Sequence, residues 1–364
     1  MRSDLNSVQS FVQKLGHCST KALRIFPPEF AHNLAGFFLK QRKTLLNVPV
    51  AKVVEAFNLK TNMGENFSVQ HPIALAAGFD KNAEFLPGLS KLGFSFIEVG
   101  AVTPRPQRGH EKPRLFREPE QRALINRMGF NNKGVQTINQ SLLSFQKNQS
   151  SQNQLLGVNI GPNKETALEK ALKDYLDLMN SVTADMAYFS VNLSSPNTAS
   201  LKSLCRPDFI KEMASHIASD TDRLTKDVWI KLGPNLSQKD FHKIIEAIKE
   251  NDFAGVILTN TYPIEKPQKG GLSGHPLLIQ STKCLEWAYD VHKGSLPMVG
   301  VGGILSGADI FEKLIRGACL IQIYTAFVYR GPFVVYELLL ELVEVLKARG
   351  FNSVEEARGS FYDA

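Results

Sequence analysis

From about residue 72 onward, short apolar runs rich in β-branched residues alternate with longer segments of helical periodicity. Short apolar runs bounded by glycine or polar residues are typical of strands buried on both faces. The pattern therefore predicts eight strands. The candidates are PIALAAG (72–78), FSFIEVG (94–100), LLGVNIG (155–161), AYFSVNLS (187–194), DVWIKLG (227–233), FAGVILTNT (253–261), LPMVGVGG (296–303) and ACLIQIYT (318–325).

The segments between these strands carry apolar residues at helix spacing. In SQKDFHKIIEAIKEN (237–251) the apolar positions recur three or four residues apart behind Ser237, a residue type that favours the N-cap. The last strand precedes a long predicted helix, PFVVYELLLELVEVLKARG (332–350). Pro332 is expected in the first turn of this helix and Gly350 at its end.

Eight strands, each followed by a helix, imply parallel strands that are covered on both faces. The arrangement that closes such a sheet without edges is the (β/α)8 barrel, an α/β TIM-barrel fold, and a doubly wound open sheet is the alternative. In a barrel the reacting groups lie at the carboxyl ends of the strands. Polar or glycine residues follow one predicted strand after another, at 78–82, 100–103, Asn159, Asn192, Ser194, Ser195, Lys231, 259–261, 302–303 and 324–325.

Two stretches interrupt the simple repeat. Residues 62–71 are expected to form a hairpin turn ahead of the first barrel strand. The segment 104–154 is too long for a plain strand-to-helix connection. It is predicted to carry an extra excursion over the barrel mouth (114–132) before a helix at 134–146.

The N-terminal 45 residues are expected to form a small helical extension, followed by a barrel domain over 46–364. SVQSFVQKLG (7–16) and PPEFAHNLAGFFLKQRK (27–43) each gather apolar residues on one helical face. Two interpretations are open: a pair of helices that caps the barrel, which the residues alone favour, or a hairpin that lies in a bilayer interface with its cations toward the headgroups.

Composition and charge narrow the classes of partner. With 43% hydrophobic and 21% charged residues, the chain is typical of globular proteins. A net charge of +7 suits an anionic substrate, an anionic cofactor, a lipid surface or a nucleic acid. The richest basic run (105–122) contains three glutamates and a single aromatic residue, Phe116, which argues against nucleic-acid binding.

The cysteines and the apolar segments carry further expectations. Four scattered cysteines without a C-x-x-C pair predict neither a zinc site nor a disulfide framework, and we expect no metal and a reducing compartment. No apolar run reaches the length of a membrane span, and no signal peptide is recognised at the N-terminus. The lack of an Arg- and Ser-rich, acidic-poor leader followed by a spanning helix favours a bacterial host.

Several motifs together resemble the dihydroorotate dehydrogenase family over about residues 20–350. They are AAGFDKN (76–82), EVGAVTPRPQRGHEKPRLFR (98–117), INRMGFNN (125–132), GVNIGPNK (157–164), VNLSSPNT (191–198), GGLSGHPL (270–277) and VGVGGILSG (299–307). The quinone-dependent class 2 of that family has a serine base and an N-terminal PPE-x-A-H stretch. Ser195 and PPEFAH (27–32) match both features.

The resemblance implies oxidation of (S)-dihydroorotate to orotate in pyrimidine (UMP) biosynthesis, with FMN as the redox cofactor and a membrane quinone as the electron acceptor. Ser195 is then the catalytic base. The implied substrate residues are Lys81, Asn126, Arg127, Met128, Gly129, Phe130, Asn192, Asn197, Asn260 and Thr261. The implied FMN residues are Ala77, Gly78, Phe79, Asp80, Lys81, Ala101, Asn159, Asn192, Lys231, Thr259, Gly274, Gly303, Tyr324 and Thr325.

The resemblance also implies a quinone site at His32 and Arg117, near Tyr324, and it favours membrane docking of the N-terminal helices. We expect a monomeric, peripheral protein on the cytoplasmic face of the bacterial inner membrane, or on the mitochondrial inner membrane in a eukaryotic host. Lys231 ends an otherwise apolar strand and needs a negative partner, and the N1 edge of a reduced flavin is expected to supply one.

The same residues allow other interpretations. Serine and asparagine after a strand commonly form turns. A soluble relative that uses fumarate or NAD is disfavoured, because Ser195 stands where those enzymes have cysteine and no cysteine cluster for an iron–sulfur centre exists. A flavin-free lyase or isomerase acting on a sugar phosphate would use the lysines as a Schiff base or a phosphate clamp.

Overall fold

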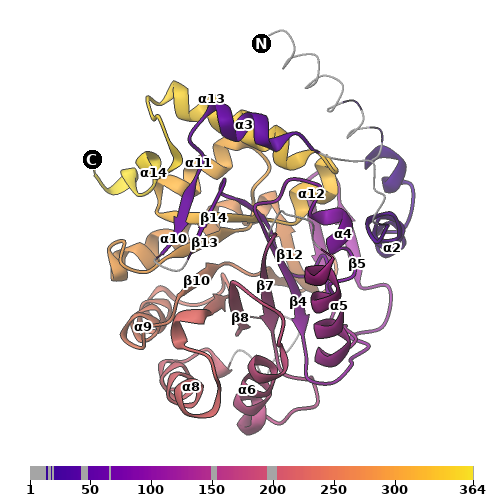
Figure 1. Ribbon diagram of the computed structural model, residues 1–364, viewed down its shortest axis with the longest axis vertical. Coiled ribbons are helices and arrows are strands. Elements are labelled where there is room, and N and C mark those ends of the chain that lie inside the picture. Colours follow the sequence, from indigo (N-terminus) through magenta and orange to yellow (C-terminus); the bar gives the residue numbers. More distant parts are fainter. Residues whose placement is uncertain are drawn as a thin grey trace.

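The computed structural model describes residues 14, 18, 20–41, 48–64, 67–148, 154–194 and 203–363. Eight parallel strands close into a barrel with helices around it (Figure 1), in the order β10-β13-β14-β3-β4-β7-β8-β9. This confirms the (β/α)8 prediction and excludes the open sheet. The barrel strands are β3 (Ile73–Leu75), β4 (Phe96–Val102), β7 (Leu155–Ile160), β8 (Tyr188–Asn192), β9 (Val228–Leu232), β10 (Gly255–Leu258), β13 (Met298–Val301) and β14 (Ala318–Ile323).

A helix follows each barrel strand and covers the outside of the sheet. The helices of this layer are α4 (Leu86–Leu89), α5 (Val135–Lys147), α6 (Ala171–Ser181), α8 (Pro207–Asp220), α9 (Gln238–Glu250), α10 (Leu278–His292), α11 (Gly307–Ile315), α12 (Thr325–Arg330) and α13 (Val334–Ala348). Outside it lie α3 (Val50–Ala56) and α14 (Val354–Ala357). Short 3-10 turns occur at Leu168–Lys170, Thr225–Asp227, His275–Leu277 and Ser360–Tyr362. Buried apolar residues of strands and helices form one large core between the two layers.

The amino-terminal end of the barrel is closed by aromatic rings. Phe96 stacks on Tyr188 with 4.7 Å between ring centroids, and Tyr188 lies 5.4 Å from Trp229. The antiparallel hairpin β1 (Thr61–Met63) and β2 (Phe67–Val69), expected within 62–71, packs Met63 and Val69 against the same cluster. Since this end is filled, a ligand can enter only from the carboxyl ends of the strands.

Two helix boundaries test the capping predictions. Ser237 caps α9 as expected, because its hydroxyl accepts a hydrogen bond from the backbone N–H of Asp240 at 3.1 Å. The last long helix, α13, begins at Val334, so Pro332 precedes the helix instead of lying in its first turn. A turn in which the N–H of Val334 donates to the carbonyl of Gly331 replaces the expected start.

A four-stranded sheet lies over the barrel mouth in the order β11-β12-β6-β5. The predicted excursion supplies β5 (Leu115–Glu118) and β6 (Ala123–Asn126), and the other two strands are β11 (Tyr262–Ile264) and β12 (Gly270–Gly274). The GGLSG segment (270–274), which lies between two predicted barrel strands and was not itself among them, is a strand. It pairs with β6, about 145 residues away, where a Cβ at position 270 would lie 2.5 Å from the Asn126 carbonyl oxygen.

Of the two predicted N-terminal helices, the segment 27–43 forms α2 (Pro28–Leu39), and 7–16 lies almost wholly outside the described residues. Helix α2 packs on α4 and β5 at the side of the molecule (Figure 1). Its outer face is apolar: Phe30, Phe37 and Phe38 are 53%, 59% and 61% exposed. Across the described part of the chain, no helix combines the length and apolar character needed to cross a membrane.

We expect acid to destabilise the fold partly through His71. This buried imidazole bonds to the Gly93 carbonyl through Nε2 (2.9 Å) and accepts from the Ile73 N–H through Nδ1 (3.3 Å), an arrangement that only the neutral ring satisfies. Burial lowers the pKa of His71 from 6.5 to about 4. The unfolded chain therefore takes up the proton first, and stability present above pH 6.5 is lost as the pH falls toward 4.

The expected loss is on the order of 3 kcal/mol for this residue. Urea unfolding of wild type and His71→Gln at pH 7 and pH 4.5 measures it. The variant should be less stable at pH 7 and less sensitive to acid, whereas equal pH sensitivity would remove His71 from this explanation.

Candidate functional site

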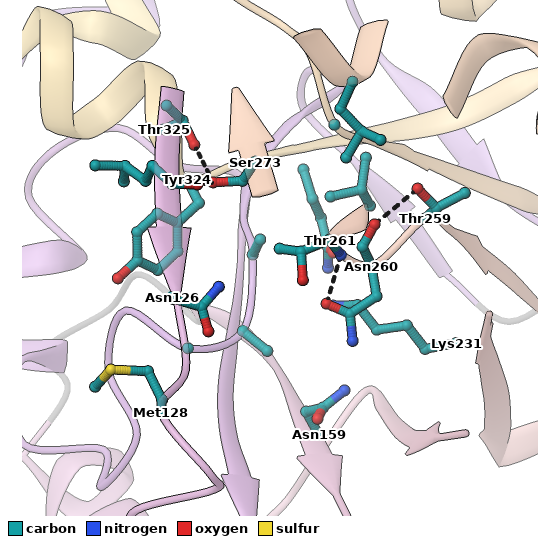
Figure 2. A pocket seen from close by; sticks show the side chains of 18 of the residues that line it. Asn126, Met128, Asn159, Lys231, Thr259, Asn260, Thr261, Ser273, Tyr324 and Thr325 are labelled. Carbon is teal, nitrogen blue, oxygen red and sulfur yellow. Dashed lines mark hydrogen bonds between the residues drawn. The ribbon is translucent and has the colours of Figure 1, made fainter. Parts of the chain in front are cut away.

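A pocket opens at the carboxyl ends of the barrel strands, beneath the mouth sheet (Figure 2). Most residues that sequence analysis assigned to substrate or cofactor line it. These are Ala77, Gly78, Lys81, Ala101, Asn126, Met128, Gly129, Phe130, Asn159, Asn192, Lys231, Thr259, Asn260, Thr261, Gly274, Gly303, Tyr324 and Thr325. The barrel therefore brings residues spread between Ala77 and Thr325 to one place.

Side-chain amides at three strand ends orient one another. Asn192 donates to Oδ1 of Asn159 (3.1 Å), and its own Oδ1 accepts from the hydroxyl of Ser194 (2.9 Å). The Nδ2 of Asn260 donates to that same hydroxyl oxygen at 3.0 Å. Asn126 is anchored separately, to the Gly271 carbonyl of the mouth sheet (3.3 Å). These bonds fix the amides before any ligand arrives.

Lys231 points into this pocket and its Nζ lies 3.5 Å from the carboxylate of Glu98. Both side chains are buried, at 5% and 0% exposure. Glu98 also accepts hydrogen bonds from Asn159 (2.9 Å), from the Tyr188 hydroxyl (2.8 Å) and from Gln322. Burial, and then the adjacent Glu98 carboxylate, raise the pKa of Tyr188 well above its usual range, so the hydroxyl remains a donor.

Glu98 is a residue that sequence analysis did not assign to the site. The sequence suggests a flavin as the negative partner of Lys231, whereas the chain supplies a carboxylate itself. The signal was present: an acid in the middle of the apolar strand FSFIEVG (94–100). Other unassigned lining residues are Ala76, Leu115, Leu124, Ser273, Leu277, Val301, Gly302, Ile304, Gln322 and Ile323.

Lys81 lies at the boundary between the barrel and α2. Its Nζ donates to the Gly78 carbonyl at 2.5 Å. Burial and then the nearby Arg114 lower the pKa of Lys81 to about 8. The side chain therefore remains mostly cationic at neutral pH and can attract an anionic group into the pocket.

Glycine-rich turns after β13 and within β12 line another part of the pocket. Gly302, Gly303 and Gly274 have φ values of +102°, +85° and +96°, a region that disfavours other residues. Within the described part of the chain, the backbone N–H groups of Gly302, Gly303 and Tyr324 donate to no protein acceptor. Ser273 and Thr325 complete this edge, with their hydroxyls 2.9 Å apart (Figure 2). Such free donors suit an anion.

A second cavity lies between α2 and the barrel mouth, and Lys81, Leu115, Met128 and Tyr324 line both cavities. His32 of α2 lines the second one, with its ring 5.0 Å from Phe79 and 5.6 Å from Phe85. Burial, and then the charge of Lys81, lower the pKa of His32 to about 3. The imidazole is therefore neutral at physiological pH.

Arg117, assigned with His32 to a quinone site, does not line this cavity. Its guanidinium donates to the Phe26 carbonyl at 2.7 Å and so holds the chain just before α2. The arginine that does line the second cavity is Arg114. Its guanidinium donates to the Glu29 carboxylate of α2 at 2.8 Å and to the Arg108 carbonyl at 2.7 Å.

Three further assigned residues lie outside the first pocket. Asp80 accepts from the backbone N–H groups of Glu84 and Phe85, at 2.9 and 2.7 Å, at the start of α4. Phe79 and Asp80 line the second cavity instead. Arg127 donates to the Pro113 carbonyl at 2.9 Å and covers the ring of Phe116. Ser195 and Asn197 lie outside the described residues.

Comparisons with known proteins agree with this geometry. The family model described as dihydroorotate dehydrogenase matches residues 58–346. A relative from Shewanella loihica named dihydroorotate dehydrogenase (quinone) is 39% identical over 337 residues, covering 88% of this chain and 95% of the relative. The mitochondrial dihydroorotate dehydrogenase (quinone) of Mus musculus is 38% identical, covering 92% of this chain and 87% of the relative.

Solved structures show the same fold. The crystal structure of the Eimeria tenella enzyme named DHODH, in complex with ferulenol, superposes with a TM-score of 0.84 at 31% identity, covering 93% of this chain and 96% of that one. Its ligand-free form superposes with a TM-score of 0.85. This chain therefore belongs to the dihydroorotate dehydrogenase family, in its quinone-dependent class 2, and is an oxidoreductase of pyrimidine biosynthesis.

Proposed function

We propose that this chain oxidises (S)-dihydroorotate to orotate with FMN in the barrel-mouth pocket and passes the electrons to a membrane quinone. The observation that carries the proposal is one pocket that combines a buried lysine, oriented amides and backbone donors that have no acceptor among the described residues. Each of these groups matches one part of a flavin nucleotide or of an anionic pyrimidine.

The pocket residues fit FMN. The free N–H groups of Gly302, Gly303 and Tyr324 would hold the phosphate. Ala77, Gly78 and Ala101 have small or no side chains and permit close approach of a flat ring. The buried Oε1 of Gln322 has no hydrogen-bond partner among the described residues, as expected where a bound molecule supplies a donor. FMN, when bound, supplies the acceptor for the hydride from C6 of the substrate.

Polar groups on the other side of the pocket suit the substrate. Lys81 is a cation for the carboxylate of dihydroorotate, and Asn126, Asn192 and Asn260 offer amide donors and acceptors for its ring. Because hydrogen bonds within the protein already orient these amides, little conformational entropy is lost on binding. Thr261 and Asn197 are proposed to complete the contacts.

We propose Ser195 as the base that takes the proton from C5. A serine hydroxyl is weakly basic, so it needs a hydrogen-bonded partner that accepts its own proton. Ser195 follows β8 directly after Ser194, whose hydroxyl is engaged with Asn192 and Asn260. The hydroxyl of Ser195, the next residue in the chain, is the one proposed to accept the proton from C5.

The second cavity is the proposed quinone site. It adjoins the flavin pocket through their four shared residues, and neutral His32 can donate a hydrogen bond to a quinone oxygen without a charge. The exposed phenylalanines of α2 would insert into the bilayer beside this cavity. Since one chain lines both cavities, a monomer is sufficient for the whole reaction. We propose that it is a peripheral protein of the bacterial inner membrane or, in a eukaryote, of the mitochondrial inner membrane.

Two observations on the purified protein test the proposal. The protein should be yellow and release FMN on denaturation. With dihydroorotate it should reduce a quinone analogue at least tenfold faster than fumarate or NAD. A tenfold ratio of rates corresponds to a difference of about 1.4 kcal/mol in activation free energy. A colourless protein, or preference for fumarate or NAD, would refute it.

Removing the apolar face of α2 should uncouple the two half-reactions. We expect Phe30→Ser, Phe37→Ser and Phe38→Ser together to reduce quinone turnover in lipid vesicles by at least tenfold, since each buried aromatic ring contributes about 1.5 to 3 kcal/mol. Anaerobic reduction of the flavin by dihydroorotate should be unchanged. Rapid-mixing absorbance and vesicle sedimentation measure the two effects.

A matched control removes an exposed apolar side chain elsewhere. Ile279 on α10 is 83% exposed, and Ile279→Ser should alter neither half-reaction. Deletion of residues 1–45 should repeat the effect of the triple variant. Equal loss of both half-reactions would mean that the N-terminal segment only supports the barrel.

A further inference from the structure

Behind the glycine turn of the flavin pocket lies a lysine with no role in the proposal above. Lys313 of α11 is fully buried. Its Nζ donates to the hydroxyls of Ser281 (2.8 Å) and Thr282 (3.1 Å), both on α10. The aliphatic part passes beneath β13, where a Cβ at Gly300 would lie 3.1 Å from Cδ of Lys313.

This ammonium has no carboxylate partner among the described residues. Asp309, on the same helix, acts on Lys313 only through its charge, and its carboxylate accepts from the N–H groups of Leu305 and Ser306 at 2.9 Å each, at the start of α11. Arg316, just beyond α11, pairs with Glu286 and Glu312. Lys313 also interacts with Cys284 of α10. Burial raises the pKa of the Cys284 thiol to about 12, so this side chain stays neutral. A buried cation without an anion is costly.

Ser281 connects this charge to the flavin pocket. While its hydroxyl oxygen accepts from Lys313, its hydrogen can be donated to the Gly302 carbonyl, which lies 2.9 Å away. The same turn rests on the start of α10, since a Cβ at Gly303 would lie 2.2 Å from Cα of Leu278. The Gly302–Gly303 turn is therefore held by a close backbone contact with Leu278 and by a hydrogen bond from Ser281, called the tether below.

We propose that Lys313, acting through Ser281, positions the Gly302–Gly303 turn and provides a buried positive charge for the phosphate end of the flavin nucleotide. This inference rests on the proposed binding of FMN. Lys313 is a positioning residue: it lines neither cavity, and through Ser281 it polarises the Gly302–Gly303 peptide, whose N–H, that of Gly303, is proposed to face the phosphate. The phosphate in return supplies the anion that the lysine lacks.

The pH dependence of binding follows from the same arrangement. Burial lowers the pKa of Lys313 to about 7, and a bound dianion favours the ammonium form. FMN affinity should therefore fall as the pH rises from 7 toward 9. The phosphate itself, with a second pKa near 6, is mostly dianionic over that range, so its own titration does not cause the fall.

The test compares FMN with riboflavin, which lacks the phosphate. Full-length protein freed of flavin is titrated with each ligand by fluorescence quenching at pH 7 and pH 9. Lys313→Met is expected to weaken FMN about tenfold at pH 7 and to leave riboflavin within about twofold, since a hydrogen bond to a charged group accounts for about one order of magnitude in affinity. The pH dependence that remains for FMN should match that of riboflavin, because Lys81 in the same pocket, with a pKa of about 8, acts on both ligands.

Two further variants separate the tether from general packing. Ser281→Ala, which removes little volume, should weaken FMN several-fold and not riboflavin. Thr282→Val removes the other partner of Lys313 but not the contact with Gly302, so it should have little effect. Equal losses for FMN and riboflavin, or equal losses in Ser281→Ala and Thr282→Val, would overturn the inference. Wild-type protein that binds no FMN would instead refute the proposed function.

Discussion

Replacing Ser195 by alanine is expected to slow flavin reduction by dihydroorotate about a hundredfold to ten-thousandfold, the range typical of a lost general base. The variant should stay yellow and bind orotate as tightly as wild type, because the groups proposed to hold FMN and orotate belong to other residues. Rapid-mixing absorbance of the bound flavin measures the rate, and the spectral shift on adding orotate measures binding. Unchanged flavin reduction would remove Ser195 from the role of base.

The neighbouring serine provides the matched control. The Ser194 hydroxyl bonds to the amides of Asn192 and Asn260. Ser194→Ala should therefore raise the KM for dihydroorotate several-fold by loosening these amides, while flavin reduction at saturating substrate stays within about tenfold, since a neutral hydrogen bond contributes about 1 kcal/mol. The reverse pattern, with the larger rate loss in Ser194→Ala, would mean that Ser194 and not Ser195 is the base.

The second large effect is expected at Lys231. Lys231→Met should lower the free energy of unfolding by about 3 to 5 kcal/mol, because it leaves the Glu98 carboxylate buried without its cation. It should also abolish most turnover, since the same ammonium is proposed to lie against the flavin. Urea unfolding and steady-state quinone reduction measure the two losses separately.

A second substitution separates stability from chemistry. Glu98→Gln in the Lys231→Met background removes the remaining charge while keeping a side chain that Asn159 and Tyr188 can still contact. Most of the stability should return, and turnover should not. Failure to recover stability would mean that Glu98 is not the charge partner of Lys231, and recovery of turnover would mean that the lysine is not needed for the reaction.

Family membership bears on the interpretations left open by the sequence. A dehydrogenase of the quinone-dependent class is neither a flavin-free lyase nor an isomerase, so that interpretation is excluded. The fumarate- and NAD-dependent alternative had been disfavoured because Ser195 stands in place of cysteine, and the names of the relatives agree with this. The roles of individual site residues stay predictions for the variants above.

The sequence by itself determined the barrel. Strands buried on both faces must be apolar throughout, and each crossover helix must have one apolar and one polar face. Both patterns depend only on residues close together in sequence, so they can be recognised without knowing the fold. Capping is equally local, as Ser237 shows. The barrel rule then placed Lys81, Asn159, Lys231 and Thr325 at one mouth without knowledge of any contact.

Only the tertiary structure decided which groups meet across long sequence separations. The pairing of β12 with β6 and the ion pair of Glu98 with Lys231 join segments about 145 and about 133 residues apart. The contact of Arg114 with the second cavity and with Glu29 of α2, about 85 residues away, likewise distinguishes Arg114 from the nearby Arg117. Periodicity reports which face a residue occupies but not what lies opposite it. The partner is set by barrel closure and by the need of each buried charge for a counter-charge or donor, which no local pattern encodes.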